Sequence, residues 1–396
     1  MSHYELFADT IDGRLHVAVM QKGIVQNIYV DHADMSLSWS SIYCGKVTKI
    51  DTKLDAAIID LGNGHSGFLS AKHVHTKDAD SSQKRTGIAD LVKPGEILLV
   101  QVKSEAKKGS LHENHKLPRL TTKVYLMGQY LAYGPNAHQV SISHKIKNDK
   151  THQVASSLPG KGAWIVHTTS DKVEEDALRH EATSLLTKWE KIEASAKSAD
   201  MPRLISPGLN ALERALCDYG TPDLEHLYVG NKDILDLAMK WSQIHAPALA
   251  ASKRLRLHKP EPTAQHLFDL HDIYTAIEDT RSPRINLPSG GSVVLEQTHA
   301  MIVADVNQGN ASAAAGANRE AATEIARHIR LRNLSGAILI DFIDTGQKSD
   351  RADVLDILEK ALASDRAQAQ VHGFTRLGIV EITRKRRSAT LAEKFS

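Results

Sequence analysis

The chain has very little cysteine and no long apolar run, and each shortage narrows the class of protein. Its two cysteines, Cys44 and Cys217, lie far apart and match no metal-binding spacing, so we expect buried thiols in a reducing compartment. No apolar run approaches the roughly 20 residues of a membrane-spanning helix, and residues 1–12 do not resemble a secretory signal. The sequence therefore predicts a cytoplasmic protein with no membrane partner.

An excess of one charge is also missing. The 49 Lys and Arg residues balance 47 Asp and Glu residues, which gives a formal net charge of +2. This balance neither suggests nor excludes a nucleic-acid partner, and any basic surface must be local. With 396 residues, the chain is long enough for several modules that each bury a core.

Two apolar runs that end in carboxylates are the most informative feature present. Residues 301–307 read as a buried strand that reaches Asp305, and residues 337–344 read as a second strand that reaches Asp341. A helix is expected between them, beginning near Asn318 as its cap. A strand, helix and strand joined in this way run parallel, so neighbouring strands would bring both acids to one sheet edge.

The chemistry of this edge has two readings. Paired acids with an amide nearby, here Asn307, form a hard-oxygen site suited to Mg²⁺ or Mn²⁺. Acids at strand ends also cap the loops that follow, and spacing alone leaves both readings open. Asp344 is expected to lie in the loop after the second strand.

The remaining patterns predict β-structure in the first part of the chain. Residues 15–28 alternate as a hairpin, and residues 42–122 have the short strands and glycines of an OB-fold barrel. On that barrel, Phe68 is a candidate for stacking on a base, although it also suits a core position. The candidates for contacts with a nucleic-acid backbone are Lys46, Lys49 and Lys116.

A basic run, residues 384–387, follows the last predicted strand. A run of charges such as this one is usually a solvent-exposed end, but its position just beyond a strand would also let it line the path of a phosphate backbone.

Taken together, these motifs resemble the ribonuclease E/G family over nearly the whole chain. The matching segments are Leu287–Ser292, Asp305-Val306-Asn307, Glu320-Ala321-Ala322, Glu324-Ile325-Ala326-Arg327, Arg330-Leu331-Arg332, Gly336, Ile340-Asp341-Phe342-Ile343-Asp344, Leu377-Gly378, Glu381 and Thr383-Arg384-Lys385-Arg386. Their order along the chain is the order in the family.

The resemblance implies a multidomain α/β architecture. An RNase H-like region would be split around an OB-fold barrel, followed by a 5′-sensor subdomain and a DNase I-like catalytic domain. The implied bounds are 1–38 and 201–282 for the two RNase H-like parts, 39–122 for the OB fold, 123–200 for the sensor and 283–396 for the catalytic domain.

The resemblance also implies a reaction. Asp305 and Asp341 match the family's Mg²⁺ ligands, and Asn307 matches the amide that orients the first of them. The expected activity is endonucleolytic cleavage of single-stranded RNA, leaving 5′-phosphate and 3′-hydroxyl ends, in RNA processing or decay. Phe68 and Lys116 match RNA-binding positions of the barrel.

Departures from the family pattern support an alternative, an RNA-binding member with weak or no catalysis. In the sensor, Gly128 and Thr168 match, but His167 replaces an arginine and is expected to bind a 5′-monophosphate less well. Ile58 replaces a second stacking aromatic, and His299 replaces a glutamate. The family's zinc-binding cysteines have no counterpart, so no zinc is predicted, and any homodimer would form by other contacts. A phosphoesterase acting on small nucleotides is a third reading.

Overall fold

The computed structural model describes residues 3–32, 35–76, 87–106, 117–143, 146–259, 266–363 and 365–395. The chain divides into two compact units. The first contains Asp31–His258 with Thr10–Leu15, and the second contains Ser2–Asp9, His16–Val30 and Lys259–Ser396. The finer division into five parts stays a prediction.

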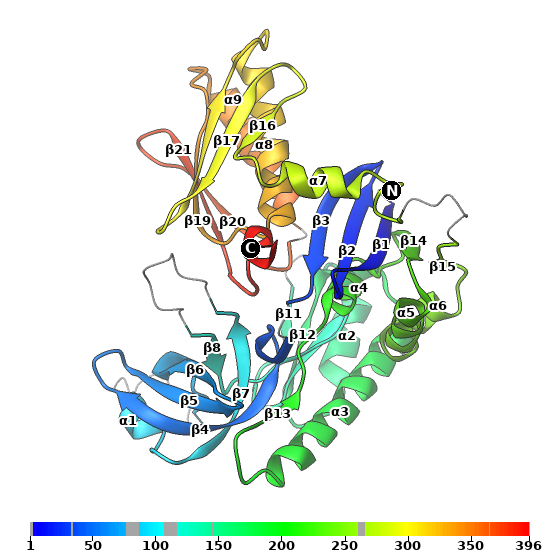
Figure 1. Cartoon of the computed structure of the whole chain (residues 1–396), viewed down its shortest axis with the longest axis vertical. Coiled ribbons are helices and arrows are strands. Elements are labelled where there is room, and N and C mark those ends of the chain that lie inside the picture. Colours follow the sequence, from blue (N-terminus) through cyan, green and yellow to red (C-terminus); the bar gives the residue numbers. More distant parts are fainter. Residues whose placement is uncertain are drawn as a thin grey trace. The chain divides into compact units, whose positions relative to one another are not determined.

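A closed β-barrel lies in the first unit (Figure 1). Its strands are β4 (Ile42–Asp51), β5 (Ala56–Gly62), β6 (His65–Ser70), β7 (Ile97–Ser104) and β8 (Arg119–Thr121). They pair in the order β4-β5-β6-β8-β7, and β7 returns to β4, which closes the barrel and bears out the OB-like topology. The 3-10 helix η2 (Ala71–His73) and the short α1 (Ile88–Leu91) connect β6 to β7, and β13 (Arg203–Ser206) extends β4.

Every second side chain along a barrel strand points inward and contributes to the barrel core. On β5, Ala57, Ile59 and Leu61 are buried in its core, whereas Ile58 between them is half-buried outside that core. One glycine of the barrel, Gly67, is required by packing, because a Cβ at this position would lie 2.5 Å from the Leu120 side chain. The strands close around Leu120 only when β6 carries no side chain at this point.

A smaller sheet and several helices complete the first unit. The sheet has the order β11-β12-β10-β9, with β9 (Leu126–Met127), β10 (Leu131–Gly134), β11 (Ser141–Ile142) and β12 (Ala163–Val166). Its core is shared with the long helix α3 (Glu175–Lys197). The other elements are η1 (Met35–Leu37), α2 (Asp149–Ser157), η3 (Thr168–Lys172), α4 (Ala211–Tyr219), β14 (Leu224–Val229), α5 (Lys232–His245), α6 (Pro247–Ala250) and β15 (Leu255–Leu257).

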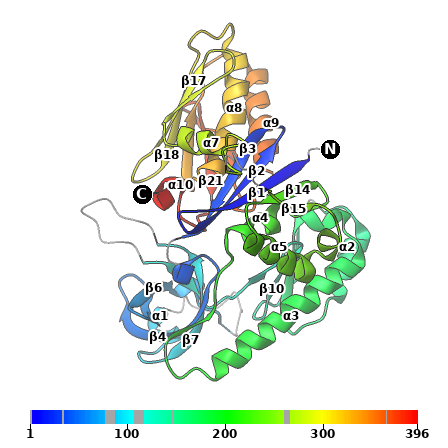
Figure 2. The same ribbon diagram turned by 45° about the vertical axis from the view of Figure 1, so that its right-hand side comes forward.

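The second unit has a six-stranded sheet of order β16-β17-β18-β19-β21-β20. Its strands are β16 (Arg284–Asn286), β17 (Ser292–Gln297), β18 (Ile302–Asn307), β19 (Gly336–Asp341), β20 (Gln370–Phe374) and β21 (Ile379–Arg384). Helices α8 (Ala314–Leu331) and α9 (Lys348–Leu362) lie on the same side of this sheet (Figures 1 and 2). Their apolar faces and the inner face of the sheet form one core. The opposite face carries half-buried and exposed residues.

The N-terminal strands of the chain confirm the predicted hairpin. They are β1 (Tyr4–Ile11), β2 (Arg14–Gln21) and β3 (Ile24–Val30), and β2 pairs antiparallel with β3. The second unit also contains α7 (Ile273–Asp279) and α10 (Leu391–Phe395). No helix in the described part of the chain combines the length and apolar character needed to cross a bilayer. Both cysteines are buried, as expected, and neither forms a disulfide.

One local prediction was wrong, and another was correct only in part. The helix between the acid strands begins at Ala314, and Asn318 lies within its first turns rather than at its cap. The basic run is solvated only in part: Lys385 is exposed, but the side chain of Arg384 is 6% exposed and its guanidinium makes a two-pronged pair with Asp365 at 2.9 and 3.1 Å. Arg384 also donates to the carbonyl oxygen of Leu334, which places this arginine in the interior of the module.

Candidate functional site: a strand-edge carboxylate pair and an OB-like surface

The two strand-end acids meet as the sequence predicts. Strands β18 and β19 pair in parallel, and Asp305 is the direct Cα partner of Asp341. Neighbouring strands lie about 4.8 Å apart, and residues in register point to the same face of a sheet. Because Ala304 and Ile340 are buried on the helix-covered face, both carboxylates project from the opposite face, where they are exposed.

Asn307 fixes the orientation of the first acid. Its Nδ2 donates a hydrogen bond of 2.9 Å to Oδ2 of Asp305, from two positions farther along the same face of β18. An amide that holds one carboxylate oxygen leaves the other, Oδ1, available to a ligand. The triad Asp305, Asn307 and Asp341 is thus preassembled on two strands.

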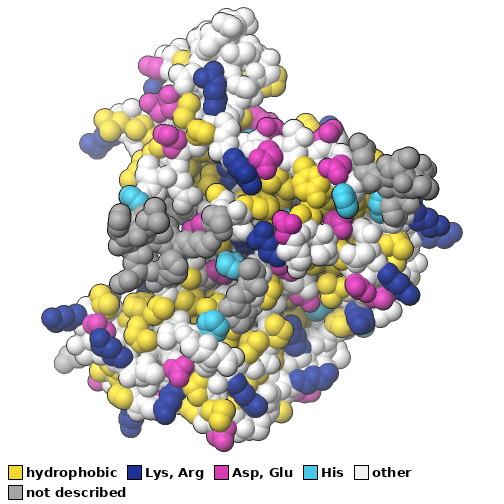
Figure 3. Space-filling view, in the orientation of Figure 1, with side chains coloured by type: hydrophobic (Ala, Val, Ile, Leu, Met, Phe, Trp, Pro, Cys, Tyr) yellow, Lys and Arg dark blue, Asp and Glu magenta, His cyan; other side chains and the backbone are white. Residues whose placement is uncertain are grey.

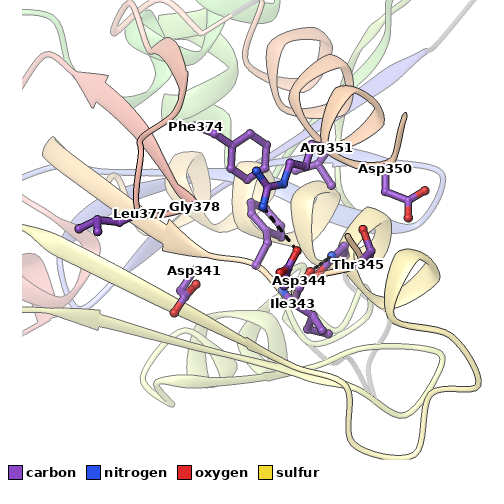
Figure 4. A pocket seen from close by; sticks show the side chains of 12 residues that line it. Asp341, Ile343, Asp344, Thr345, Asp350, Arg351, Phe374, Leu377 and Gly378 are labelled. Atoms are coloured by element: carbon purple, nitrogen blue, oxygen red, sulfur yellow. Dashed lines mark hydrogen bonds and ion pairs between the residues drawn. The ribbon is translucent and has the colours of Figure 1, made fainter. Parts of the chain in front are cut away.

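A cavity of about 110 Å³ opens beside Asp341, between the loop after β19, the start of α9 and the turn from β20 to β21. Figure 4 shows Arg351 reaching across it toward Asp344, with the Phe374 ring alongside. The guanidinium carbon of Arg351 lies 5.3 Å from the Phe374 ring centroid, and Nη2 of Arg351 is 3.4 Å from Oδ1 of Asp344. One wall of the cavity therefore combines a cation, an aromatic ring and a carboxylate.

Asp344 has a different environment from the acid pair. It lies in the loop beyond β19, as expected, and its Oδ1 accepts a hydrogen bond of 3.0 Å from the backbone N–H of Gly346. That hydrogen bond, followed by the contact with Arg351, lowers the pKa of the Asp344 carboxyl below its ordinary value. Asp344 is therefore an anion already engaged by its own loop, which agrees with a secondary role.

Asn318 is a residue of this site that sequence reasoning missed. Its side chain is 3% exposed, accepts from the backbone N–H of Ile343 at 3.1 Å and donates to the Ile343 carbonyl oxygen at 2.8 Å. These two bonds tie helix α8 to the backbone two residues beyond Asp341. The available signal was periodicity: Asn318 stands four residues before Ala322 on the apolar stripe of the helix, where a polar side chain needs buried partners.

The donor set fits a magnesium ion. Within the described ranges, no group of three or more His, Cys, Asp and Glu side chains is arranged to hold a metal. Mg²⁺ does not require one, because it keeps several waters and commonly takes only one or two protein carboxylates together with phosphate oxygens of a substrate. Asp305 and Asp341 supply two exposed hard oxygen donors on one face, oriented by Asn307. His299 lies in the turn before β18, at the opposite end of that strand from Asn307.

The barrel candidates fall into a row across four strands. Phe68 is half-buried and outside the barrel core; its Cα partners are Ile58 on β5 and Arg119 on β8. Lys49 is in turn the partner of Ile58, so a row runs Lys49, Ile58, Phe68, Arg119. Sequence reasoning did not find Arg119, since only barrel closure brings β8 beside β6.

The other two lysine candidates have different outcomes. Lys46 is exposed on β4 but pairs with Asp60 and Ile97, at a different level of the barrel from Phe68. Lys116 lies outside the described residues. The RNA-contact roles assigned to both lysines stay predictions.

The sensor-like residues also converge. Gly128 begins the turn between β9 and β10, and its N–H donates to the carbonyl oxygen of Leu131 at 2.8 Å. His167 follows β12, and its Nδ1 lies 3.4 Å from the Gln129 carbonyl oxygen in the same turn. Thr168 begins η3 next to His167. Gly128 and His167, which are far apart in sequence, therefore meet at one turn, and Thr168 directly follows His167.

Buried Glu181 holds that turn in place. Its carboxylate accepts hydrogen bonds from the backbone N–H groups of Gln129, Tyr130 and Leu131 at 2.6, 2.8 and 2.9 Å. A Cβ at Gly128 would lie 2.5 Å from the same carboxylate, which explains a glycine here. The turn is therefore a structural anion nest filled by the chain's own side chain.

The fold and the site together define a protein with an OB-like barrel and a paired-carboxylate site on an α/β module. Residues 125–387 match the Ribonuclease E/G family, and the chain belongs to that family. It is 29% identical to "Ribonuclease G" of Escherichia coli (strain K12), over 96% of this chain and 80% of that protein. It is 31% identical to "Ribonuclease E" of Synechocystis sp. (strain ATCC 27184 / PCC 6803 / Kazusa), over 96% of this chain and 56% of that protein.

Proposed function

We propose that this protein is a magnesium-dependent endoribonuclease that cleaves single-stranded RNA and leaves 5′-phosphate and 3′-hydroxyl ends. The observation that carries the proposal is the in-register pair Asp305 and Asp341, with Asn307 bonded to the first, in a member of the ribonuclease E/G family. Cofactors other than Mg²⁺ with the same preference for oxygen ligands, Mn²⁺ first, would also suit this donor set.

Each residue has a defined task in this proposal. Asp305 and Asp341 would hold the ion, whose Lewis acidity polarises the scissile phosphate and activates water. Asn307 keeps the Asp305 carboxylate turned so that one oxygen is available, and Asn318 holds the backbone beyond Asp341. In-line attack of water on phosphorus breaks the bond to the 3′ oxygen, which gives the stated ends. The cavity beside Asp341 would receive the nucleotide next to the scissile phosphate.

The barrel accounts for the preference for unpaired RNA. A base can stack on Phe68 only if it is unstacked from its neighbours, which a duplex does not allow. Lys49 and Arg119 at the ends of the row would contact the backbone on either side. Because neither buried cysteine forms a disulfide, we infer a reducing, cytoplasmic setting for this reaction.

The test is a cleavage assay with product-end analysis. A 5′-labelled single-stranded oligoribonucleotide is incubated with protein over a range of MgCl₂ concentrations. Wild type is expected to produce fragments only with the metal, and Asp305→Asn and Asp341→Asn to reduce the rate at least 100-fold. Asp356→Asn is a matched control, because Asp356 is an exposed aspartate of the same unit that pairs with Lys360. Wild type that cleaves no faster than the double variant would refute the proposal.

One observation favours an alternative, a protein that binds RNA with little or no turnover. The residue beside Phe68 in the row is Ile58, which offers no aromatic face, so a base would be held by one ring only. The alternative predicts binding in the absence of any metal-dependent product. Equilibrium binding of the same oligonucleotide, measured beside the cleavage assay, separates the two.

A further inference from the structure

A group of basic side chains on the barrel lies beyond the row of Phe68. Its members are Lys72, His73, Lys103, Arg119 and Lys123, and we name them the cationic cluster. Two of them lie in η2, Lys103 lies in β7, Arg119 lies in β8, and Lys123 is the second residue after β8. All are exposed except His73, which is half-buried.

A close contact and several hydrogen bonds hold the cluster together. The ammonium group of Lys103 lies 3.2 Å from both ring nitrogens of His73. Lys123 donates to the carbonyl oxygen of Lys72 at 3.3 Å. The His73 carbonyl oxygen accepts from the backbone N–H of Thr122 and from Oγ1 of Thr121, each at 3.0 Å, so η2 is fastened to the end of β8. The cluster is therefore built by the barrel itself.

The charges that act on His73 are all positive. Burial, followed by the positive charges of Lys103, Lys72, Lys123 and Arg119, lowers the pKa of His73 to about 4. At neutral pH the imidazole is therefore uncharged and accommodates the Lys103 ammonium without adding a positive charge of its own. Four cations gathered around one neutral ring repel one another, and a bound anion would relieve that repulsion.

The position of the cluster indicates which anion. Arg119 is both a member of the cluster and the Cα partner of Phe68, so the cluster continues directly from the proposed base-stacking position. On the face in Figure 3, Lys and Arg side chains are interspersed with acidic ones, which suits local anion sites better than a broad field.

We propose that the cationic cluster binds the phosphodiester backbone of single-stranded RNA, at the nucleotides adjoining the base on Phe68. The inference rests on the proposed function, because it assumes that the barrel receives RNA. It adds a subsite whose contribution is electrostatic and independent of base sequence.

The test measures binding of a fluorescent 12-nucleotide single-stranded RNA by anisotropy, in EDTA so that no cleavage occurs, between 50 and 400 mM NaCl. Loss of two phosphate contacts on a single strand reduces the slope of log K against log [salt] by about 1.4. The Lys103→Ala/Lys123→Ala variant should show this reduction and, at 0.1 M salt, bind about 25-fold more weakly. Lys53→Ala/Lys93→Ala is the matched control, since it removes equal charge from exposed positions elsewhere on the barrel and should change the slope little.

Two further arms identify the ligand and the role. For an abasic oligonucleotide of equal length, the Lys103→Ala/Lys123→Ala variant should reduce the slope of log K against log [salt] by the same amount as for RNA. Phe68→Ala should weaken the binding of RNA but not of the abasic strand. Inorganic phosphate at 10 mM should displace RNA no better than chloride of equal ionic strength; stronger displacement would mean a site for free phosphate and overturn the proposal. Lys103→Arg/Lys123→Arg should retain the wild-type slope, which separates charge from folding.

The failures are distinguishable. A cluster variant with the wild-type slope and affinity, in a protein that binds and cleaves RNA, overturns the cluster and leaves the endoribonuclease intact. Wild-type protein that neither binds nor cleaves single-stranded RNA overturns the proposed function itself.

Discussion

Replacing Asn318 by alanine tests whether helix α8 positions the loop after Asp341. The change removes both hydrogen bonds to Ile343, and each such bond contributes about 0.5–1.5 kcal/mol net. Alanine recovers up to about 0.7 kcal/mol of helix propensity. The net loss is about 1–2 kcal/mol, concentrated in the segment that follows Asp341.

The measurement must be local, because all four tryptophans lie in the first unit and would not report on this loop. Hydrogen–deuterium exchange of peptides covering residues 341–346 should accelerate about 5- to 30-fold, the factor that corresponds to 1–2 kcal/mol. In the cleavage assay, the half-saturating Mg²⁺ concentration should rise, because Asp341 is held less firmly beside Asp305. The variant Asn318→Asp should be worse, since it sets a carboxylate oxygen against the Ile343 carbonyl.

The control for a general loss of stability is Ile329→Val, a fully buried position on the same helix. It costs about 0.5–1.5 kcal/mol but lies 11 residues, or roughly 16 Å, along the helix from Asn318. If Ile329→Val raises the Mg²⁺ requirement as much as Asn318→Ala does, or if Asn318→Ala leaves both exchange and Mg²⁺ dependence unchanged, the positioning role is refuted.

Three further predictions follow. Glu181→Gln should destabilise the first unit by about 1–3 kcal/mol, seen by tryptophan fluorescence in urea, because its amide cannot accept from all three backbone N–H groups; an unchanged midpoint would contradict this. Wild type should cleave 5′-monophosphate and 5′-hydroxyl substrates at similar rates, whereas His167→Arg should favour the monophosphate; a large wild-type preference would show that His167 suffices. Burial, followed by the charges of Arg327 and Arg332, lowers the pKa of His328 to about 2, so near pH 5 only the unfolded chain protonates this imidazole. The free energy of unfolding should therefore fall by about 1.4 kcal/mol for each pH unit below 6.5. His328→Asn should flatten that slope, measured by urea titrations followed by circular dichroism.

The acid pair was predictable because every element of it is local. Two apolar runs specify two strands, the periodic stripe between them specifies a crossover helix, and a crossover makes the strands parallel. The alternation of β18 and β19 then leaves Asp305 and Asp341 on the exposed face. The register that brings them together is observed, whereas their role as metal ligands is a proposal.

The errors arose where distant partners decide the outcome. Asn318 before an apolar stripe has the same local pattern whether it caps the helix or is buried, and only the path of the chain after β19 selects burial. Arg384 looks like part of a solvated basic run until Asp365, from a loop before β20, accepts both prongs of its guanidinium. The cationic cluster joins His73 to Lys103, 30 residues away, through barrel closure.

The composition of the row on the barrel surface leads to one expectation about how the protein binds RNA. Where the family pattern has a second aromatic, the row has Ile58, and its neighbours on either side of the apolar pair are Lys49 and Arg119. A stacked base contributes about 1–3 kcal/mol and is insensitive to salt, whereas contacts to phosphates weaken steeply as salt rises. A surface with one aromatic ring and neighbouring cations should bind RNA less through base stacking, and more through charge, than a surface with two rings. We therefore expect affinity that depends strongly on ionic strength and little on base sequence, with selectivity for cleavage arising at the cavity beside Asp341.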